Sequence, residues 1–154
     1  MRRKIKKTLY ALLVLAVILH AGLLWWSKRP VDIVAVHKSG SHSYVLVKNF
    51  PFLDKEKINW WLKNKGMLKE KYDIPNPEKE GFYSVIFWDF GEGYKETDGY
   101  DRLCFDDMKT NINCIDKEKY FTVWNGRNND ISFGVHDGEY FIKENGQMVK
   151  RKYE

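Results

Sequence analysis

The sequence predicts an α+β protein, with an N-terminal transmembrane helix followed by a small antiparallel β-sheet domain that carries one main packed helix. Three observations support this fold class. An apolar run without a formal charge, residues 8–26, lies near the start of the chain. One later stretch repeats apolar residues at helical spacing, and the remainder contains short apolar segments separated by Gly, Pro, Asn and Asp.

The apolar run at residues 8–26 is long enough to cross a bilayer as a helix. Its 19 residues, at a rise of about 1.5 Å each, span roughly 28 Å, which is close to the hydrocarbon thickness of a membrane. A cleaved signal peptide has the same order of basic, apolar and polar segments, but small residues at alternate positions do not follow this run. We therefore expect an uncleaved anchor in contact with the lipid bilayer.

Positive charge lies mainly on the N-terminal side of the anchor. Residues 1–7 contain five Arg and Lys, whereas only Lys28 and Arg29 follow the anchor directly. The positive-inside rule then predicts a cytoplasmic basic tail over residues 1–7 and an exported domain over residues 27–154.

The exported part by itself is slightly acidic. Seven of the 26 Lys and Arg lie in residues 1–29, so 19 remain beyond residue 29, against all 21 Asp and Glu, which gives that part a net charge of −2. The total charge of +5 therefore indicates topology, and no nucleic-acid partner is predicted.

Short strands dominate the predicted exported domain. The first two, residues 31–37 and 43–49, are expected to form a hairpin. Five more strands are predicted at residues 82–89, 100–105, 119–124, 131–136 and 139–144. Asp137-Gly138 between the last two is typical of a type I′ turn. The residues from Met148 onward are expected to form a solvated tail.

One soluble helix is predicted between these strands, over residues 54–73. Asp54 is expected to be its N-cap, and Gly66 is expected to end or bend it. The expected core stripe consists of Ile58, Trp61, Leu62, Leu68 and Tyr72.

Trp60 lies outside the core stripe, on the side of the helix that carries Met67. Two roles remain open for Trp60. It can pack against a loop or a sheet edge, or it can act with Met67 as an anchor for a binding partner, because tryptophan and methionine are enriched at interfaces.

No catalytic or metal-binding constellation is predicted. The four histidines do not occur at metal-ligand spacing, and the two cysteines do not form a CxxC motif. We therefore expect a protein that is not an enzyme and needs no cofactor. An enzyme or a small-ligand-binding module remains the alternative, with a site built from dispersed carboxylates and aromatic residues.

Both cysteines, Cys104 and Cys114, lie ten positions apart in the exported part. In an oxidising compartment such a pair is expected to form a disulfide bond. A calcium loop is not expected, because Lys109 occupies a ligand position. The disulfide is expected to brace one end of the sheet, with Asp106 and Asp107 turning the chain and facing water.

Several longer strings carry a family resemblance. They are VKNFPF (47–52), KINWWL (57–62), FWDFGEGYKE (87–96) and YDRLCFDDMK (100–109), behind a basic and apolar N-terminus. With these strings the chain resembles an enterobacterial family of short inner-membrane proteins of unknown function. The resemblance implies a bacterial inner-membrane protein, and it implies no reaction, ligand or catalytic residue.

Together these observations predict a single-pass inner-membrane protein with a cytoplasmic N-terminus and a periplasmic, non-catalytic binding or interaction domain. The expected partner is another envelope protein. An immunity-type role, in which the domain neutralises a toxin that arrives through the envelope, is a narrower form of this prediction. The small size of the domain, its tether and its slightly acidic charge agree with that role.

Overall fold

A computed structural model describes residues 1–126 and 128–153 of the chain. The chain forms two compact units, Met1–Pro30 and the part from Val31 onward. The first unit contains one helix, α1 (Arg2–Ser27), which includes the basic residues before the apolar run. Lys and Arg are good helix formers, so nothing in that stretch opposes the helix. In the part of the chain that the structure describes, α1 is the one helix with the length and composition to cross a membrane.

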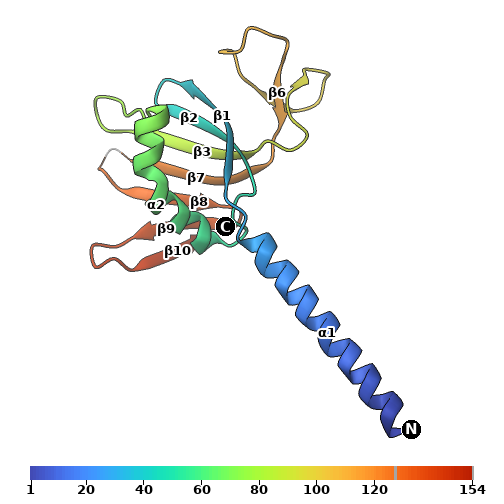
Figure 1. The fold of residues 1–154 in the computed structure, drawn as a ribbon. Helices are drawn as coiled ribbons and strands as arrows, with labels where there is room; N and C mark the ends of the chain where they lie inside the picture. The colour runs from blue at the N-terminus through green and yellow to red at the C-terminus, as the bar shows by residue number, and fades with distance from the viewer. Residues whose placement is uncertain (127, 154) are drawn as a thin grey trace. The chain divides into compact units, whose positions relative to one another are not determined.

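The second unit is built on a seven-stranded sheet (Figure 1). Its strands are β1 (Asp32–Ser39), β2 (His42–Lys48), β3 (Tyr83–Asp89), β7 (Lys119–Asn125), β8 (Ile131–Val135), β9 (Gly138–Ile142) and β10 (Met148–Lys152). They lie side by side in the order β1-β2-β3-β7-β8-β9-β10. A smaller sheet has the order β4-β6-β5, with β4 (Lys95–Glu96), β5 (Arg102–Cys104) and β6 (Ile112–Asp116).

One pair of strands in the large sheet, β2 and β3, is parallel, and the other pairs are antiparallel. The helix α2 (Asp54–Tyr72) connects β2 to β3. Parallel neighbours need such a crossover, because the chain must return to the end of the sheet at which it began the previous strand. The predicted α+β class is confirmed, with a mostly antiparallel sheet.

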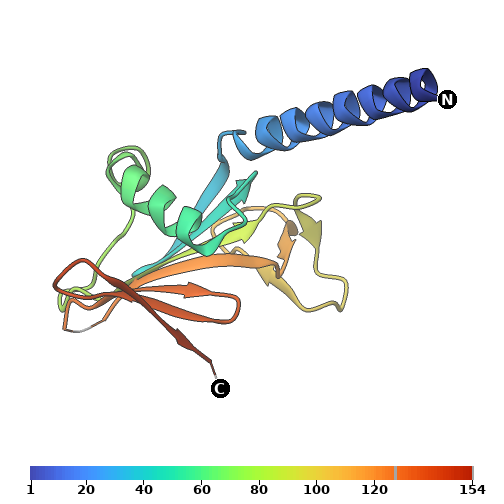
Figure 2. The same ribbon diagram turned by 90° about the horizontal axis from the view of Figure 1, so that it is seen from below.

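Helix α2 covers one face of the large sheet (Figure 2). Ile58, Trp61 and Leu68 are at most 2% exposed, as the core stripe predicts, and Tyr72 packs against the same core. Leu62 is instead 40% exposed, so its assignment to the core was wrong.

The ends of α2 also differ from the prediction. Asp54 is the first helical residue, and Leu53 occupies the N-cap position without a side-chain cap. The helix continues through Gly66, because the packing of residues on both sides offsets the weak helix propensity of glycine.

Both faces of β2 are buried. Val45 and Val47 pack in the core under α2, whereas Leu46 packs on the opposite face with Phe105 and Ile115 from the region of the small sheet. Alternate residues of a strand point to opposite faces, so a continuous apolar run such as YVLV fits a strand that is covered on both sides. The region of the small sheet therefore packs on the face of β1, β2 and β3 opposite to α2.

Three strands were not predicted: β4, β6 and β10. The C-terminal segment, expected to be a solvated tail, is the edge strand β10. It is antiparallel to β9: Met148 pairs with Ile142 at one end, and Lys152 pairs with Gly138 at the other. Its sequence is mostly basic, so it lacks the alternation that marks a half-buried strand. Backbone pairing with β9 decides its structure.

The turn between β8 and β9 is shifted by one residue from the predicted position. Val135 pairs with Gly138, so the two loop residues are His136 and Asp137. Gly138 lies in the strand, where a Cβ atom would lie 2.5 Å from the carbonyl oxygen of Arg151. Close approach of β10 explains the glycine at this position.

The strand register defines two ends of the large sheet. The chain enters at Asp32, which pairs with Lys48 at the end of β2. The same end, called the entry end below, also contains the end of β3, the start of β7, the β8–β9 turn and the end of β10. The opposite end is called the far end.

Gly138→Ala is expected to destabilise the second unit by about 1–3 kcal/mol, because the new methyl group forces β9 and β10 apart. Gly66→Ala is the matched control: apart from its chain neighbours and the nearby backbone of its own helix, no atom lies within 4 Å of its Cβ position, and removing a helical glycine should stabilise by about 0.5–1 kcal/mol. Chemical unfolding of the full chain in detergent measures both changes. Equal effects of the two substitutions would contradict the close approach at Gly138.

Candidate functional site

Cys104 and Cys114 face each other across the small sheet. They are register partners in β5 and β6, and their sulfur atoms lie 2.09 Å apart. This geometry fits the predicted disulfide bond. The location differs from the prediction, because the bond joins two strands of the small sheet and does not brace an end of the large one.

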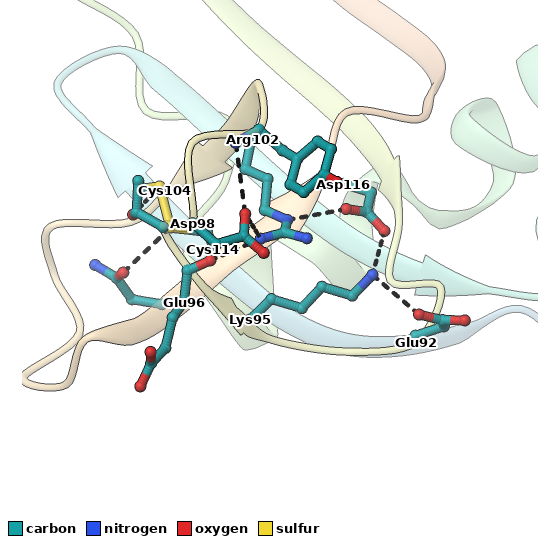
Figure 3. Close-up of polar contacts among 11 residues, drawn as sticks. Glu92, Lys95, Glu96, Asp98, Arg102, Cys104, Cys114 and Asp116 are labelled. Atoms are coloured by element: carbon teal, nitrogen blue, oxygen red, sulfur yellow. Dashed lines mark hydrogen bonds and ion pairs between the residues drawn. A yellow bond between two sulfur atoms is a disulfide. The ribbon is translucent and has the colours of Figure 1, made fainter.

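A network of charged side chains covers the same small sheet (Figure 3). Arg102 contacts Asp98 and donates to Asp116 from Nε at 3.1 Å. Lys95 Nζ lies 2.6 Å from Asp116 and 2.9 Å from Glu92. Hydrogen bonds from Lys95, and then from Arg102, hold the pKa of Asp116 below its ordinary value. The disulfide and these contacts hold together strands that are too short to bury much apolar area of their own.

A buried histidine joins the small sheet to β1. His37 is 7% exposed, and its ring stacks on Phe105 at 4.0 Å between centroids. Its Nδ1 lies 2.8 Å and 2.9 Å from the two carboxylate oxygens of Asp107, and its Nε2 lies 2.8 Å from the Tyr94 hydroxyl. Burial, and then the charge of Asp107, raises the pKa of Tyr94. Tyr94 therefore stays a neutral donor to Nε2 when Nδ1–H donates to Asp107.

Asp106 and Asp107 lie in a turn and are exposed, as expected from the sequence. The side chain of Asp107 is 45% exposed, and it also contacts and orients the imidazole of His37, which the sequence did not predict. A carboxylate, an imidazole and a hydroxyl in series can move a proton. In this fold they also have a structural role, because they connect segments that are 57 and 70 residues apart in the sequence.

A cavity of about 500 Å³ opens at the entry end of the large sheet. We call it the sheet-end pocket. Its apolar lining comes from the β2–α2 loop, with Phe50, Phe52 and Leu53. Its polar lining comes from Asp54 and Lys57 of α2, Glu118 and Lys119 near the start of β7, Tyr120 and His136.

The polar groups of the sheet-end pocket are held close to one another. Lys57 is 8% exposed, and its Nζ donates to the backbone oxygen of Tyr120 at 3.2 Å and lies 3.9 Å from Asp54. Burial lowers the pKa of Lys57, and the charge of Asp54 partly opposes this shift. Burial, the charge of Asp89 and a hydrogen bond to it raise the pKa of Tyr120 to about 12. Since cations and carboxylates alternate around the pocket, its charge selects neither an anion nor a cation.

A second cavity, of about 510 Å³, lies between α2 and the strands β8 and β9. We call it the α2–β9 groove. Its apolar lining consists of Trp61, Leu62, Ile131, Phe133, Phe141 and Ile142. Leu62, Ile131 and Ile142 are each 40% exposed. The register places Ile131 and Ile142 at the far end of the sheet, away from the entry of the chain.

The two residues proposed for partner binding lie on α2, outside the lining of the α2–β9 groove. The Trp60 ring packs edge-to-face against Phe50 and Phe87, at 5.5 Å and 5.6 Å between centroids. This is the packing role left open by the sequence. Met67 is 37% exposed. Partner binding by Trp60 and Met67 stays a prediction.

Two buried polar residues of these sites, His37 and Lys57, were missed by sequence reasoning. Lys57 precedes Trp61 by four residues and Leu68 by eleven, so helical spacing alone places it on the core stripe. For His37 the only local signal is its place at the end of an apolar strand segment. Its partners are too distant in sequence to be inferred.

The described ranges, 1–126 and 128–153, contain no group of three or more His, Cys, Asp or Glu residues that could hold a metal ion.

Replacing both cysteines by serine, Cys104→Ser with Cys114→Ser, is expected to cost about 3 kcal/mol, because the bond closes a loop of about 11 residues in the unfolded chain. The loss should be local: amide exchange should rise in β5 and β6 and change little in β3 and β7. Hydrogen exchange by mass spectrometry measures this. Wild-type protein treated with a reductant is the matched control, and unchanged exchange in β5 and β6 in both samples would contradict the role of the bond.

Comparison with known proteins places the chain in a family. A family model described as "Enterobacterial putative membrane protein (DUF943)" matches residues 2–152, which include α1 and all the strands named above. The resemblance carried by the four sequence strings is thereby confirmed. No curated protein and no solved structure matches the chain. The chain belongs to this enterobacterial family.

Proposed function

We propose that the protein is anchored in the bacterial inner membrane by α1 and that its folded unit, in the periplasm, binds another envelope protein without catalysing a reaction. The observation that carries the binding role is the α2–β9 groove.

The side chains of α1 support the anchor. No residue of this helix is buried, and its leucines and valines are exposed on all sides. A helix that is apolar all round needs an apolar environment, which a bilayer provides. At its C-terminal end the Arg29 guanidinium lies 4.6 Å from the ring centroids of both Trp25 and Trp26. Tryptophan rings and long basic side chains are typical of the membrane–water interface.

The α2–β9 groove supports the binding role. Leu62, Ile131 and Ile142 together leave a connected apolar surface in contact with water. Complete burial of one such side chain stabilises by about 1.5–3 kcal/mol, so a partner that covers three half-exposed ones gains a useful part of its binding energy. Lys65 and Asp130 also line the groove and can orient a polar backbone or side chain of the partner. An apolar centre with a polar rim is typical of protein interfaces.

An immunity-type role is a narrower form of this proposal. A small domain tethered to the inner membrane meets a toxin at its point of arrival. The net charge of −2 beyond residue 29 would favour a basic partner. In this form of the proposal the groove makes the apolar contact with the toxin, and the negative net charge of the domain increases the rate at which a basic toxin associates with it.

The alternative, a small-ligand-binding module, is favoured by a different observation. The sheet-end pocket brings together Asp54, Glu118 and His136 with the rings of Phe50 and Tyr120. These are dispersed carboxylates and aromatic residues that the fold assembles in one place. Lys57 already donates to the backbone oxygen of Tyr120, and Asp54 lies 3.3 Å from Lys150 Nζ, so fewer polar groups are left for a ligand and protein binding is the stronger proposal.

The orientation of the anchor is testable with a fusion after Glu154 to an enzyme that is active only in the periplasm. We expect an active fusion, because five basic residues precede the apolar run and hold that side in the cytoplasm. The same fusion with Arg2, Arg3, Lys4, Lys6 and Lys7 replaced by glutamine should lose part of this bias. A stable but inactive fusion of the unaltered chain would reverse the proposed orientation.

Binding at the groove is testable with a photo-reactive amino acid at position 62 of the full chain, activated in intact cells. We expect a specific protein adduct, because Leu62 lines the groove and is 40% exposed. The control carries the same amino acid at Lys63, an exposed residue of the same helix that does not line the groove.

Two results would contradict this proposal. Equal protein adducts at positions 62 and 63 would indicate contact without a specific site at the groove. A small molecule that copurifies with the protein, together with no protein adduct at position 62, would favour the ligand-binding alternative.

A further inference from the structure

We propose that the loop between β2 and α2 contacts the lipid surface of the bilayer, through Phe52 and Leu53. This inference rests on the proposed membrane anchor and goes beyond it. The anchor requires only α1, whereas the lipid contact adds a second attachment that belongs to the folded unit itself.

The loop lies at the entry end of the large sheet. Asp32, the first residue of β1, pairs with Lys48, the last residue of β2. The loop begins directly after Lys48 and ends where α2 begins at Asp54. Strand neighbours are about 4.8 Å apart, so the loop starts beside the point at which the chain enters the sheet.

The chain between α1 and the sheet is short. Helix α1 ends at Ser27, and β1 begins at Asp32. Four fully extended residues cover at most about 14 Å. Each headgroup layer of a bilayer is about 5–8 Å thick. Because Trp25 and Trp26 suit the interface, this tether keeps the entry end within reach of the lipid headgroups.

The loop presents its apolar side chains in opposite directions. Phe50 packs inward, stacked on Phe87 at 5.0 Å between ring centroids. Phe52, two residues later, is 90% exposed, and Leu53 is 57% exposed. An exposed aromatic ring beside an exposed leucine is unfavourable in water. The same pair is typical of a segment that enters the boundary between headgroups and acyl chains.

Charge at the entry end agrees with lipid but does not drive the contact. Lys48 and Lys55 flank the loop and are both exposed, which suits anionic headgroups. Asp32 and Glu118 lie at the same end and are also exposed, so the two signs nearly balance. The apolar side chains therefore determine where the loop rests, and the contact should depend weakly on salt.

The contact would set the direction in which the domain faces. With α1 and the loop both held by lipid, the domain has two attachments at its entry end. The α2–β9 groove has residues at the far end, Ile131 and Ile142, so it would open away from the membrane. A partner approaching through the periplasm would then meet the groove first.

The experiment uses the full chain in vesicles of phosphatidylethanolamine and phosphatidylglycerol that contain a small fraction of clickable lipid. A benzophenone amino acid replaces Phe52 in one variant and Glu144, an exposed residue of the β9–β10 turn at the far end, in the other. We expect several-fold more lipid adduct at position 52 than at position 144. Both variants should unfold at the wild-type temperature, because both positions are exposed, and a Phe50→Ala variant should not.

The outcomes separate this inference from the anchor. If the protein floats with the vesicles but position 52 gives no more lipid adduct than position 144, the lipid contact is overturned and the anchor stands. If the protein does not float with the vesicles, the anchor and the lipid contact both fail. A protein dimer crosslinked at position 52 in place of a lipid adduct also overturns the inference, in favour of contact between two copies.

Discussion

The packing of aromatic rings around Phe87 is the interaction on which the folded unit depends. Phe87 is fully buried in β3, with Phe50 at 5.0 Å and Trp60 at 5.6 Å between ring centroids. Phe121 of β7 and Trp61 of α2 complete the cluster at 5.8 Å and 6.3 Å. These rings come from two strands, one helix and one loop, so they determine how α2 lies on the sheet. The sheet-end pocket and the α2–β9 groove both have a wall on α2, and their shapes follow from this cluster. Large rings suit a small domain, because each buries much apolar area at a single position.

The two faces of the large sheet are covered in different ways, for a reason of size. Helix α2 is long enough to bury a continuous apolar stripe, so hydrophobic packing is sufficient on its face. The small sheet has strands of two, three and five residues. The buried apolar side chains from its region are Phe105 and Ile115, with Tyr94, Leu103 and Met108 partly buried beside them, and covalent and polar contacts add to this packing. The disulfide bond, the ion pairs of Arg102 and Asp116, and the contact between His37 and Asp107 each join segments that apolar packing alone would hold weakly.

The proposed function assigns different tasks to the two ends of the large sheet. At the entry end the chain continues into α1, and the exposed side chains of the β2–α2 loop suit a lipid surface. Toward the far end, the α2–β9 groove combines an apolar centre with a polar rim, which suits a protein surface. A tethered domain gains from this separation, because a recognition surface at the membrane would be covered by lipid. The parallel pair of β2 and β3 makes the arrangement feasible, since the crossover carries α2 from the entry end back to the far end.

The sequence by itself determined the features of this protein that depend on residues close together in the chain. The charge-free run of α1, the helical spacing of Ile58, Trp61 and Leu68, and the β8 and β9 strand segments were all predicted from sequence, because each is a periodicity along the chain. The disulfide bond between the two cysteines was predicted from the expected oxidising compartment.

The tertiary structure decided the other features. Pairing with β9 makes a strand of the basic segment from Met148, whose own residues do not favour one. The contact between His37 and Asp107 spans 70 positions. Leu62 stays 40% exposed because the α2–β9 groove lies open between it and the residues of β8 and β9. Each of these depends on which distant segment lies opposite, and the residues of one segment do not carry that information.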